Sequence, residues 1–250
     1  MTAPVDQLIL NFPLDPVCTF ANLVIGDGNH KAADAVRALA ENRTTLLVQL
    51  ATALLLIGEE GTGKTHLLQA AVTHCRALSG EESAIYLNTV ALREQLRESG
   101  EQDLTRFLDR HAACRLVAVD DLEELEASPS LQEGILYLFN RMRDTGGHLL
   151  VAGQKSPQAL EGLRPDLRSR LLWGSVMALD LPEDEMLGAI LAKMVDDRQV
   201  RCGPELLKFL QLRLPRRIPD YAAALDRLNE ASLGLKRPLT VPLAKEVLDL

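Results

Sequence analysis

The residues with the clearest chemistry lie between Gly58 and Thr65 and read Gly-Glu-Glu-Gly-Thr-Gly-Lys-Thr. This spacing, G-x-x-x-x-G-K-[ST], is typical of a phosphate-binding loop when a strand precedes it and a helix follows. The apolar run Leu54–Ile57 predicts the strand, and His66–Ala71 predicts the start of the helix. Glycines let backbone N–H groups approach phosphate oxygens, and the dipole of the helix favours the same anion. We therefore predict a phosphate site here; the competing interpretation is a glycine-rich turn that caps an ordinary core helix.

The polar groups of this loop have distinct expected roles. Lys64 would reach the β and γ phosphates of a nucleotide, and the Thr65 hydroxyl would be a ligand of Mg²⁺. The residues that we expect to contact the nucleotide from this loop are Gly58, Gly61, Thr62, Gly63, Lys64, Thr65 and His66.

Two adjacent carboxylates end another apolar stretch, Arg115–Asp121, which predicts a buried parallel strand. Ligands of open α/β sheets bind at the carboxyl ends of the strands. Asp120 is therefore predicted to hold Mg²⁺, directly or through water, and Asp121 to orient the attacking water during hydrolysis. The competing interpretation is a solvated Asp-Asp turn.

The overall composition argues against several other classes of function. The 250 residues are 47% hydrophobic, enough to bury a substantial core. A net charge of -8 argues against a broad electrostatic grip on duplex nucleic acid, and an aromatic content of 4% argues against a stacking platform for single strands. Four scattered cysteines are typical of reduced thiols in a cytosolic protein. Without a signal segment or a bilayer-length apolar stretch, we expect a cytoplasmic protein that does not contact membranes.

Strand and helix patterns alternate along the first part of the chain. Further strands are predicted at Ala84–Asn88, His148–Gly153 and Val176–Leu181, and helical stretches at Ala32–Ala40 and Leu104–Leu108. Asn29 is placed to cap the first of these helices. The alternation implies an α/β domain with a parallel sheet covered on both faces.

From Pro182 onward the apolar periodicity is purely helical. The last helix is predicted at Thr240–Leu248, with Thr240 as its cap. We therefore expect an α/β nucleotide-binding domain at residues 19–181 and a small all-helical domain at residues 182–250.

Residues 1–18 are expected to be extended, because three prolines between Pro4 and Pro16 forbid a regular helix. The alternation of Leu8, Leu10 and Phe12 with other residues fits this conformation. From the residues alone, packing on the chain's own domain is favoured over docking on another protein.

Together, these segments resemble the AAA+ ATPases, and among them the DnaA/Hda family, over nearly the whole chain. The stretch Thr19–Asn29 is similar to the opening of the family's nucleotide module, so the resemblance assigns adenine contacts to Val24, Ile25 and Gly26. Val119–Asp121 resembles the family's metal-binding strand. The resemblance implies an AAA+ module with a parallel five-stranded sheet and a helical lid, which binds ADP or ATP with Mg²⁺.

Two further segments resemble regulatory parts of the family. Arg168–Gly174 looks like the box that supplies an arginine finger to a neighbouring subunit, which places the finger on Arg170. From the residues alone, the three arginines of this region, Arg164, Arg168 and Arg170, could instead form the solvated face of a short helix. Residues 7–12 resemble the clamp-binding motif of Hda-type proteins, and this resemblance reverses the preference for self-packing. The implied clamp contacts are Gln7, Leu8, Leu10 and Phe12.

The resemblance implies a regulator of chromosome replication initiation that docks on the sliding clamp and stimulates hydrolysis of DnaA-bound ATP. Its partners would be DnaA, the clamp and, in a homo-oligomer, further copies of itself. The chain ends where DnaA continues into a helix-turn-helix domain, so sequence-specific DNA binding is not expected. Two alternatives are a self-hydrolysing motor or helicase loader, and a nucleotide-bound scaffold without catalytic output.

Three positions depart from the family pattern. Gln154 stands where the family has an acidic residue after the fourth strand, and Asp166 stands where DnaA carries an additional arginine. Pro219 replaces a lid arginine, so Arg216 or Arg217 would have to take over that contact. Intrinsic ATP turnover is therefore expected to be weak or absent.

Overall fold

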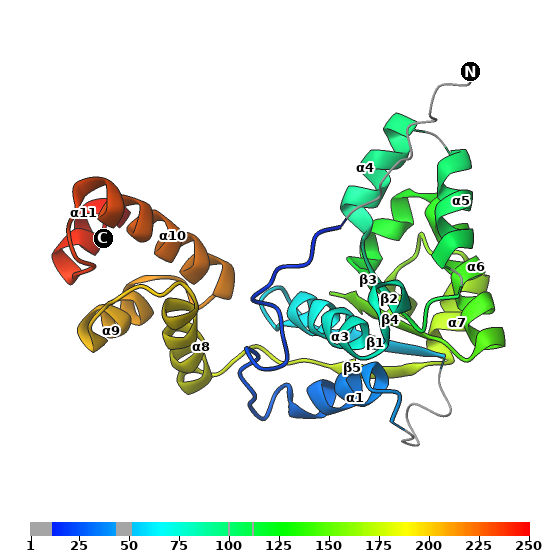
Figure 1. Cartoon of the computed structure of the whole chain (residues 1–250), viewed down its shortest axis with the longest axis horizontal. Helices are drawn as coiled ribbons and strands as arrows, with labels where there is room; N and C mark the ends of the chain where they lie inside the picture. The colour runs from blue at the N-terminus through cyan, green and yellow to red at the C-terminus, as the bar shows by residue number, and fades with distance from the viewer. Residues whose placement is uncertain (1–11, 44–51, 100, 112) are drawn as a thin grey trace. The chain divides into compact units, whose positions relative to one another are not determined.

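Five short apolar stretches form one parallel sheet in the computed structural model, which describes residues 12–43, 52–99, 101–111 and 113–250 (Figure 1). The strands are β1 Ala53–Ile57, β2 Ala84–Asn88, β3 Leu116–Asp120, β4 His148–Gly153 and β5 Ser175–Ala178. Their order is β2-β3-β4-β1-β5, and every pair is parallel. The predicted parallel five-stranded sheet is therefore confirmed. The fifth strand ends earlier than predicted, since Leu179 makes the last hydrogen bond to β1, from its N–H to the Ile57 carbonyl.

Helices cover this sheet and follow it in the chain. Those around the sheet are α1 His30–Ala40, α3 Lys64–Ser79, α4 Thr89–Ser99, α5 Glu101–His111, α6 Pro129–Thr145 and α7 Pro165–Leu172. After the sheet follow α8 Asp184–Asp197, α9 Pro204–Arg213, α10 Ile218–Leu235 and α11 Val241–Leu248. The predicted all-helical segment is confirmed, whereas α4 and α6 were not recognised in the sequence.

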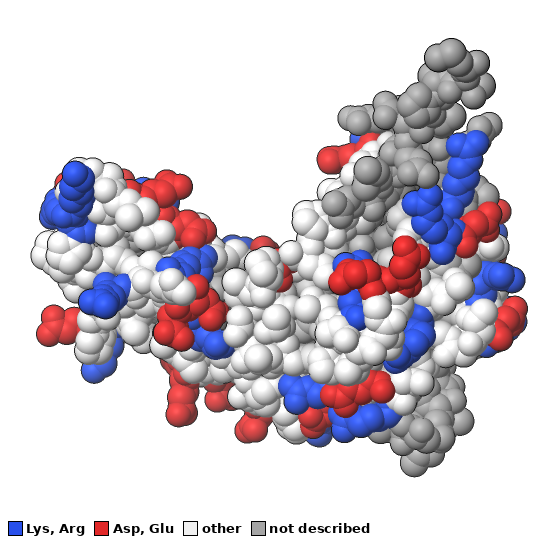
Figure 2. Space-filling model, viewed as in Figure 1, with Lys and Arg blue, Asp and Glu red and all other residues white. Residues whose placement is uncertain are grey.

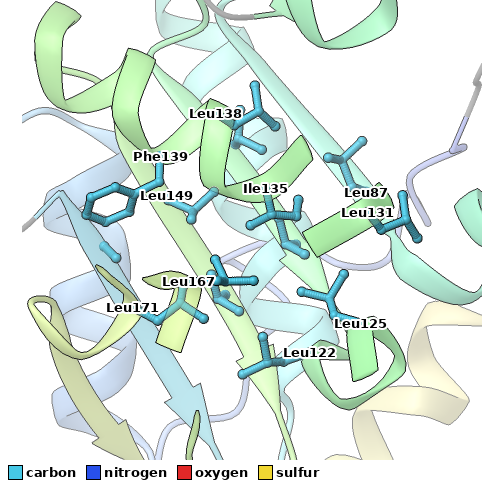
Figure 3. Packing of buried hydrophobic residues seen from close by; sticks show 14 of the residues in the cluster. Leu87, Leu122, Leu125, Leu131, Ile135, Leu138, Phe139, Leu149, Leu167 and Leu171 are labelled. Carbon is cyan, nitrogen blue, oxygen red and sulfur yellow. The ribbon is translucent and has the colours of Figure 1, made fainter. Parts of the chain in front are cut away.

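The two faces of the sheet bury two separate layers of apolar side chains. Because side chains alternate along a strand, Leu54 and Leu56 join the layer beneath α1 and α3, while Leu55 joins the layer beneath α6 and α7. Figure 3 shows Leu167 and Leu171 of α7 in that second layer, and both are fully buried. The short helix α7 is therefore fixed firmly to the sheet.

The described residues divide into two compact units. The first contains the residues up to Leu23 and Asn29–Asp180, and the second contains Val24–Gly28 and Leu181–Leu250. The helices of the second unit share their own core around residues such as Leu191, Leu210 and Tyr221. This core lets the helical unit pack independently of the sheet.

The two predicted helix caps differ. The Thr240 hydroxyl accepts a hydrogen bond from the Leu243 N–H, as expected for the cap of α11. Asn29 lies at the N-cap position of α1, but its side chain makes no capping hydrogen bond. The predicted cap is therefore confirmed for Thr240, whereas for Asn29 only the position is confirmed and the side-chain capping bond is missing.

Charges of both signs lie interspersed on the face of the molecule drawn in Figure 2. In the described part of the chain, no helix combines the length and the apolar character needed to cross a membrane.

Candidate functional site

The predicted phosphate loop connects β1 to α3. Its glycines occupy positions at which a residue with a side chain would be strained or would clash. Gly61 and Gly63 have φ angles of 86° and 92°, in the left-handed region that favours glycine. A Cβ on Gly58 would lie 2.5 Å from the Leu179 carbonyl oxygen, closer than atoms can approach. The loop backbone is thus shaped by the glycines that the spacing singled out.

Lys64 begins α3 and lies over this loop. Its ammonium donates hydrogen bonds of 2.7 Å to the carbonyls of both Gly58 and Glu59. Burial lowers the pKa of Lys64, while the carboxylates of Asp120 and nearby acids oppose that shift. Lys64 is therefore a positive group held at the loop, where the predicted phosphate contact requires it.

Asp120 ends β3 and Asp121 follows it, and both lie near Lys64, as their effect on its pKa indicates. Asp120 is 2% exposed, while Asp121 is half-buried and adopts a left-handed backbone with φ 59°. Burial and the neighbouring Asp120 carboxylate raise the pKa of Asp121 to about 6. A strained backbone and a pKa near neutrality suit a residue that handles a proton.

Two residues that the sequence analysis did not select orient these acids. The Tyr86 hydroxyl donates a 2.9 Å hydrogen bond to Oδ2 of Asp120. The Asn88 amide donates one of 3.0 Å to Oδ2 of Asp121, while its own oxygen accepts from the Ala91 N–H. Asn88 ends a predicted strand, so its polar side chain at the end of that strand could have marked it as a site residue. The pairing of β2 with β3, which brings it to Asp121, is not visible in the sequence.

The predicted magnesium ligands supply hard oxygen donors. Both carboxylate oxygens of Asp120 accept hydrogen bonds, from Tyr86 and from the Asp121 N–H, and each keeps lone pairs for a cation. Thr65 is exposed. Among the described residues, no three His, Cys, Asp or Glu side chains could together hold a metal. Mg²⁺ usually takes one or two protein ligands plus phosphates and waters, so this set fits nucleotide-bound Mg²⁺.

The predicted nucleotide contacts outside the loop are placed as follows. His66, in the first turn of α3, directs Nε2 at the Thr19 carbonyl oxygen, 2.8 Å away, and so ties the preceding segment to this helix. Val24, Ile25 and Gly26 belong to the second unit, where a Cβ on Gly26 would lie 2.8 Å from the Met186 sulfur. Their contact with adenine stays a prediction.

The three arginines around α7 have different surroundings. Arg164 pairs with Asp166 at 2.9 Å, and both side chains are exposed. Arg168 donates to three backbone carbonyls, those of Leu160, Glu161 and Leu163. Arg170 makes neither kind of contact within the described residues; its guanidinium lies over the Trp173 ring, 4.0 Å from the ring centre.

The segment that leads from Arg170 into β5 and the phosphate loop lie at opposite ends of β1. Gly174, just before β5, abuts the backbone of Ala53 at the start of β1 so closely that a Cβ would collide with it. The loop follows Ile57 at the other end of β1. Four steps of about 3.3 Å separate these ends, so roughly 13 Å of strand lies between them.

The positions that depart from the family pattern have local partners. The backbone N–H of Gln154, not its side chain, donates to the Glu123 carboxylate at 3.1 Å. Arg216 pairs with Asp184 at 2.8 Å and Arg217 with Asp220 at 3.7 Å. Both arginines are exposed, so these pairs are weak.

The predicted clamp motif is only partly visible. Gln7, Leu8 and Leu10 lie outside the described residues. Phe12 is half-buried and packs against the apolar residues of the sheet domain.

Comparison with known proteins places the chain. A family model described as the bacterial DnaA ATPase domain matches residues 14–178, and one described as the Hda lid domain matches residues 184–248. DnaA of Wolbachia pipientis is 30% identical over 96% of this chain and 52% of its own length, so the chain spans about half of such curated relatives. An uncharacterized protein of Haemophilus influenzae is 36% identical over 77% of this chain and 80% of its own.

Solved structures agree in fold. Domain III of DnaA from Thermotoga maritima superimposes with a TM-score of 0.81, at 23% identity, over 95% of this chain and 98% of that chain. AMPPCP-bound DnaA from Aquifex aeolicus gives 0.69, at 23% identity, over 90% of this chain and 69% of that chain. With the matched ATPase and lid domains, the protein belongs to the DnaA/Hda family of AAA+ ATPases.

Proposed function

We propose that this protein regulates replication initiation by stimulating hydrolysis of ATP bound to DnaA, with Arg170 as the arginine finger. In this proposal it binds ADP or ATP with Mg²⁺ at its own phosphate loop and docks on the sliding clamp through residues 7–12. The family membership supports a role in replication initiation. The residues of the site support the individual steps.

Nucleotide binding is supported by the geometry of the loop. Lys64 is held at the loop by two hydrogen bonds. Gly61 and Gly63 adopt left-handed φ angles and carry no Cβ that would block the approach of a phosphate to the backbone N–H groups. Asp120, Asp121 and Glu123 surround Lys64 with negative charge. A bound Mg²⁺ would offset the repulsion between these acids and the phosphates, with Thr65 and Asp120 as its protein ligands.

The position of Arg170 is the observation that carries the proposal. A guanidinium stabilises the charge that spreads over the γ-phosphate oxygens in the transition state. Arg170 is four residues before Gly174, which packs at the amino end of β1, while the phosphate loop of the same chain follows the carboxyl end of that strand. This separation supports action on a partner's nucleotide rather than on its own. Arg164 and Arg168 are already engaged in local contacts.

Clamp docking rests on the sequence motif. Phe12 packs on its own domain in this structure, so docking would require either release of Phe12 or anchoring by Leu8 and Leu10.

The test is ATP turnover by DnaA with and without this protein and clamp-loaded DNA. The wild-type protein should accelerate hydrolysis, and Arg170→Ala should abolish the acceleration, because fingers of this kind are worth about 10³ to 10⁵ in rate. Arg170→Lys should also fail, since a point charge does not reproduce the planar fork. Arg164→Ala is the matched control, because it removes an exposed arginine from the same segment. Full stimulation by Arg170→Ala would refute the finger.

A second candidate, a self-hydrolysing ATPase, is favoured by one feature of the site. Asp121, held by Asn88, combines a nearly neutral pKa with a position beside Lys64 in the same unit. Rapid ATP turnover by the isolated protein, lost in Asp121→Asn, would support this alternative over the proposed regulator.

A further inference from the structure

Trp173 is the only tryptophan of the chain, and 56% of its surface is exposed. It directly follows α7, three residues after Arg170, and residues at this spacing lie on the same side of a helix. The Arg170 guanidinium lies 4.0 Å from the centre of the indole ring. This distance is well within the range of a cation–π interaction.

The ring is the contact that orients Arg170. Within the described part of the chain, the Arg170 side chain has no hydrogen bond or ion pair. Arg168, two residues earlier, is fixed by three carbonyl oxygens instead. An arginine without such contacts samples many rotamers, so stacking on a fixed ring narrows the directions that it adopts.

The backbone that carries the indole is rigid although the ring is exposed. The Trp173 N–H donates to the Arg170 carbonyl at 3.2 Å, and the Gly174 N–H donates to the Leu171 carbonyl at 3.1 Å. Leu171 is fully buried against the sheet, and Gly174 packs directly on the backbone of Ala53. The backbone of Trp173 is thus anchored, and its ring lies on the surface of the first unit.

We infer that Trp173 is a positioning residue for the arginine finger: its ring holds the Arg170 guanidinium in the extended direction that reaches a partner's nucleotide. This inference rests on the proposed function of Arg170. At an exposed site the stacking favours the held conformation about two- to fivefold, and this rises to about thirtyfold when a docked partner excludes water. The benefit is therefore largest when the partner is bound.

The stacking itself can be tested without a partner, because the emission of the protein comes from one tryptophan. Arg170→Ala should uncover one face of the indole and increase quenching by acrylamide. Arg164→Ala should leave quenching unchanged, as Arg164 pairs with Asp166 instead. Identical quenching in wild type and Arg170→Ala would show that Arg170 does not stay on the ring, and would overturn the inference.

The effect on function is tested with DnaA-bound ATP and clamp-loaded DNA. Trp173→Ala should lower the stimulated rate about three- to thirtyfold, with nucleotide binding and thermal unfolding unchanged. Trp173→Phe should recover most of the rate, because its ring also attracts a cation. Leu78→Ala is the control, since it truncates another exposed apolar residue of the same unit, 58% exposed.

Three results would overturn the inference while the proposed function stands. Stimulation by Trp173→Ala equal to wild type would mean that Arg170 needs no platform, and a faster rate would mean that the ring restrains the finger. Equal loss in Trp173→Ala and Trp173→Phe would mean that the indole contacts the partner directly. If Arg170→Ala itself stimulates hydrolysis as well as wild type, the finger assignment is refuted, and the role of Trp173 is refuted with it.

Discussion

The Tyr86 hydroxyl donates a 2.9 Å hydrogen bond to Oδ2 of Asp120 and thereby joins β2 to β3. The side chain of Gln69, on the helix that follows the phosphate loop, lowers the pKa of the same hydroxyl, which burial and Asp120 raise. Gln69 also accepts a 2.7 Å hydrogen bond from the backbone N–H of Asp15. The predicted metal ligand is thus connected to the phosphate-loop helix and, through it, to the N-terminal segment.

Tyr86→Phe should therefore weaken the metal site while it preserves the fold. Loss of one donor to a buried carboxylate is expected to lower the free energy of unfolding by about 1–3 kcal/mol. ADP affinity, measured by calorimetry, should fall more in the presence of Mg²⁺ than in its absence. Tyr137→Phe is the matched control, because Tyr137 makes the same bond to Asp109, at 2.6 Å, on the surface. Equal effects of the two variants would contradict a role at Asp120.

Lys64→Ala removes the cation of the phosphate loop. A charge-assisted contact is worth roughly 1.5 to 3 kcal/mol, so affinity for ADP and ATP should fall about tenfold or more. Titration calorimetry measures this directly. Lys31→Ala, which removes an exposed lysine from α1, should bind as wild type. Unchanged affinity in Lys64→Ala would mean that the glycine-rich loop is only a structural turn.

Gly58→Ala should destabilise the first unit and impair nucleotide binding. The added methyl group would meet the Leu179 carbonyl oxygen at 2.5 Å, and such overpacking typically costs about 1–3 kcal/mol. Chemical denaturation gives the change in unfolding free energy. The control is Gly203→Ala, because a Cβ there meets nothing within 4 Å and its φ is -80°. Equal free energies of unfolding for the two variants would mean that the close approach at Gly58 does not contribute to stability.

Arg168→Ala and Arg170→Ala should separate stability from activity. Arg168→Ala removes hydrogen bonds to three carbonyls and should lower the free energy of unfolding by about 1–3 kcal/mol. Arg170→Ala should change it by no more than about 1 kcal/mol, because its cation–π contact lies at the surface. Denaturant titration of both variants measures the difference. A large loss of stability in Arg170→Ala would argue for a structural role.

Replacement of Leu10 and Phe12 by alanine should abolish binding to the clamp and leave ADP affinity intact. Apolar anchors carry most of the energy when an extended peptide docks in pockets. A pull-down with purified clamp measures the loss. Val17→Ala, in the same segment and 40% exposed, is the control. Clamp affinity retained by the double variant would leave Phe12 as a residue that packs on its own domain.

Much of the fold was predictable because its signals are local. The loop from Gly58 to Thr65 needs particular residue types at particular spacings, and an apolar strand ending in Asp120 and Asp121 is visible in the order of residues. Apolar residues also alternate or run together within short segments, so the strands and the helical C-terminal segment could be recognised. The cap at Thr240 follows the same logic, since it involves only a residue three positions away.

The tertiary structure decided which of these segments meet. The order β2-β3-β4-β1-β5 brings Tyr86 and Asn88 to the acids that follow β3. It also puts Gly174, four residues after Arg170, at the end of β1 opposite the phosphate loop. It also groups Val24–Gly28 with the helices that follow Leu181. Such pairings join residues far apart in the chain, and they are selected by burial of whole faces rather than by any local pattern. For that reason the residue types at the site were legible in the sequence, whereas the partners that orient them became apparent only in the folded chain.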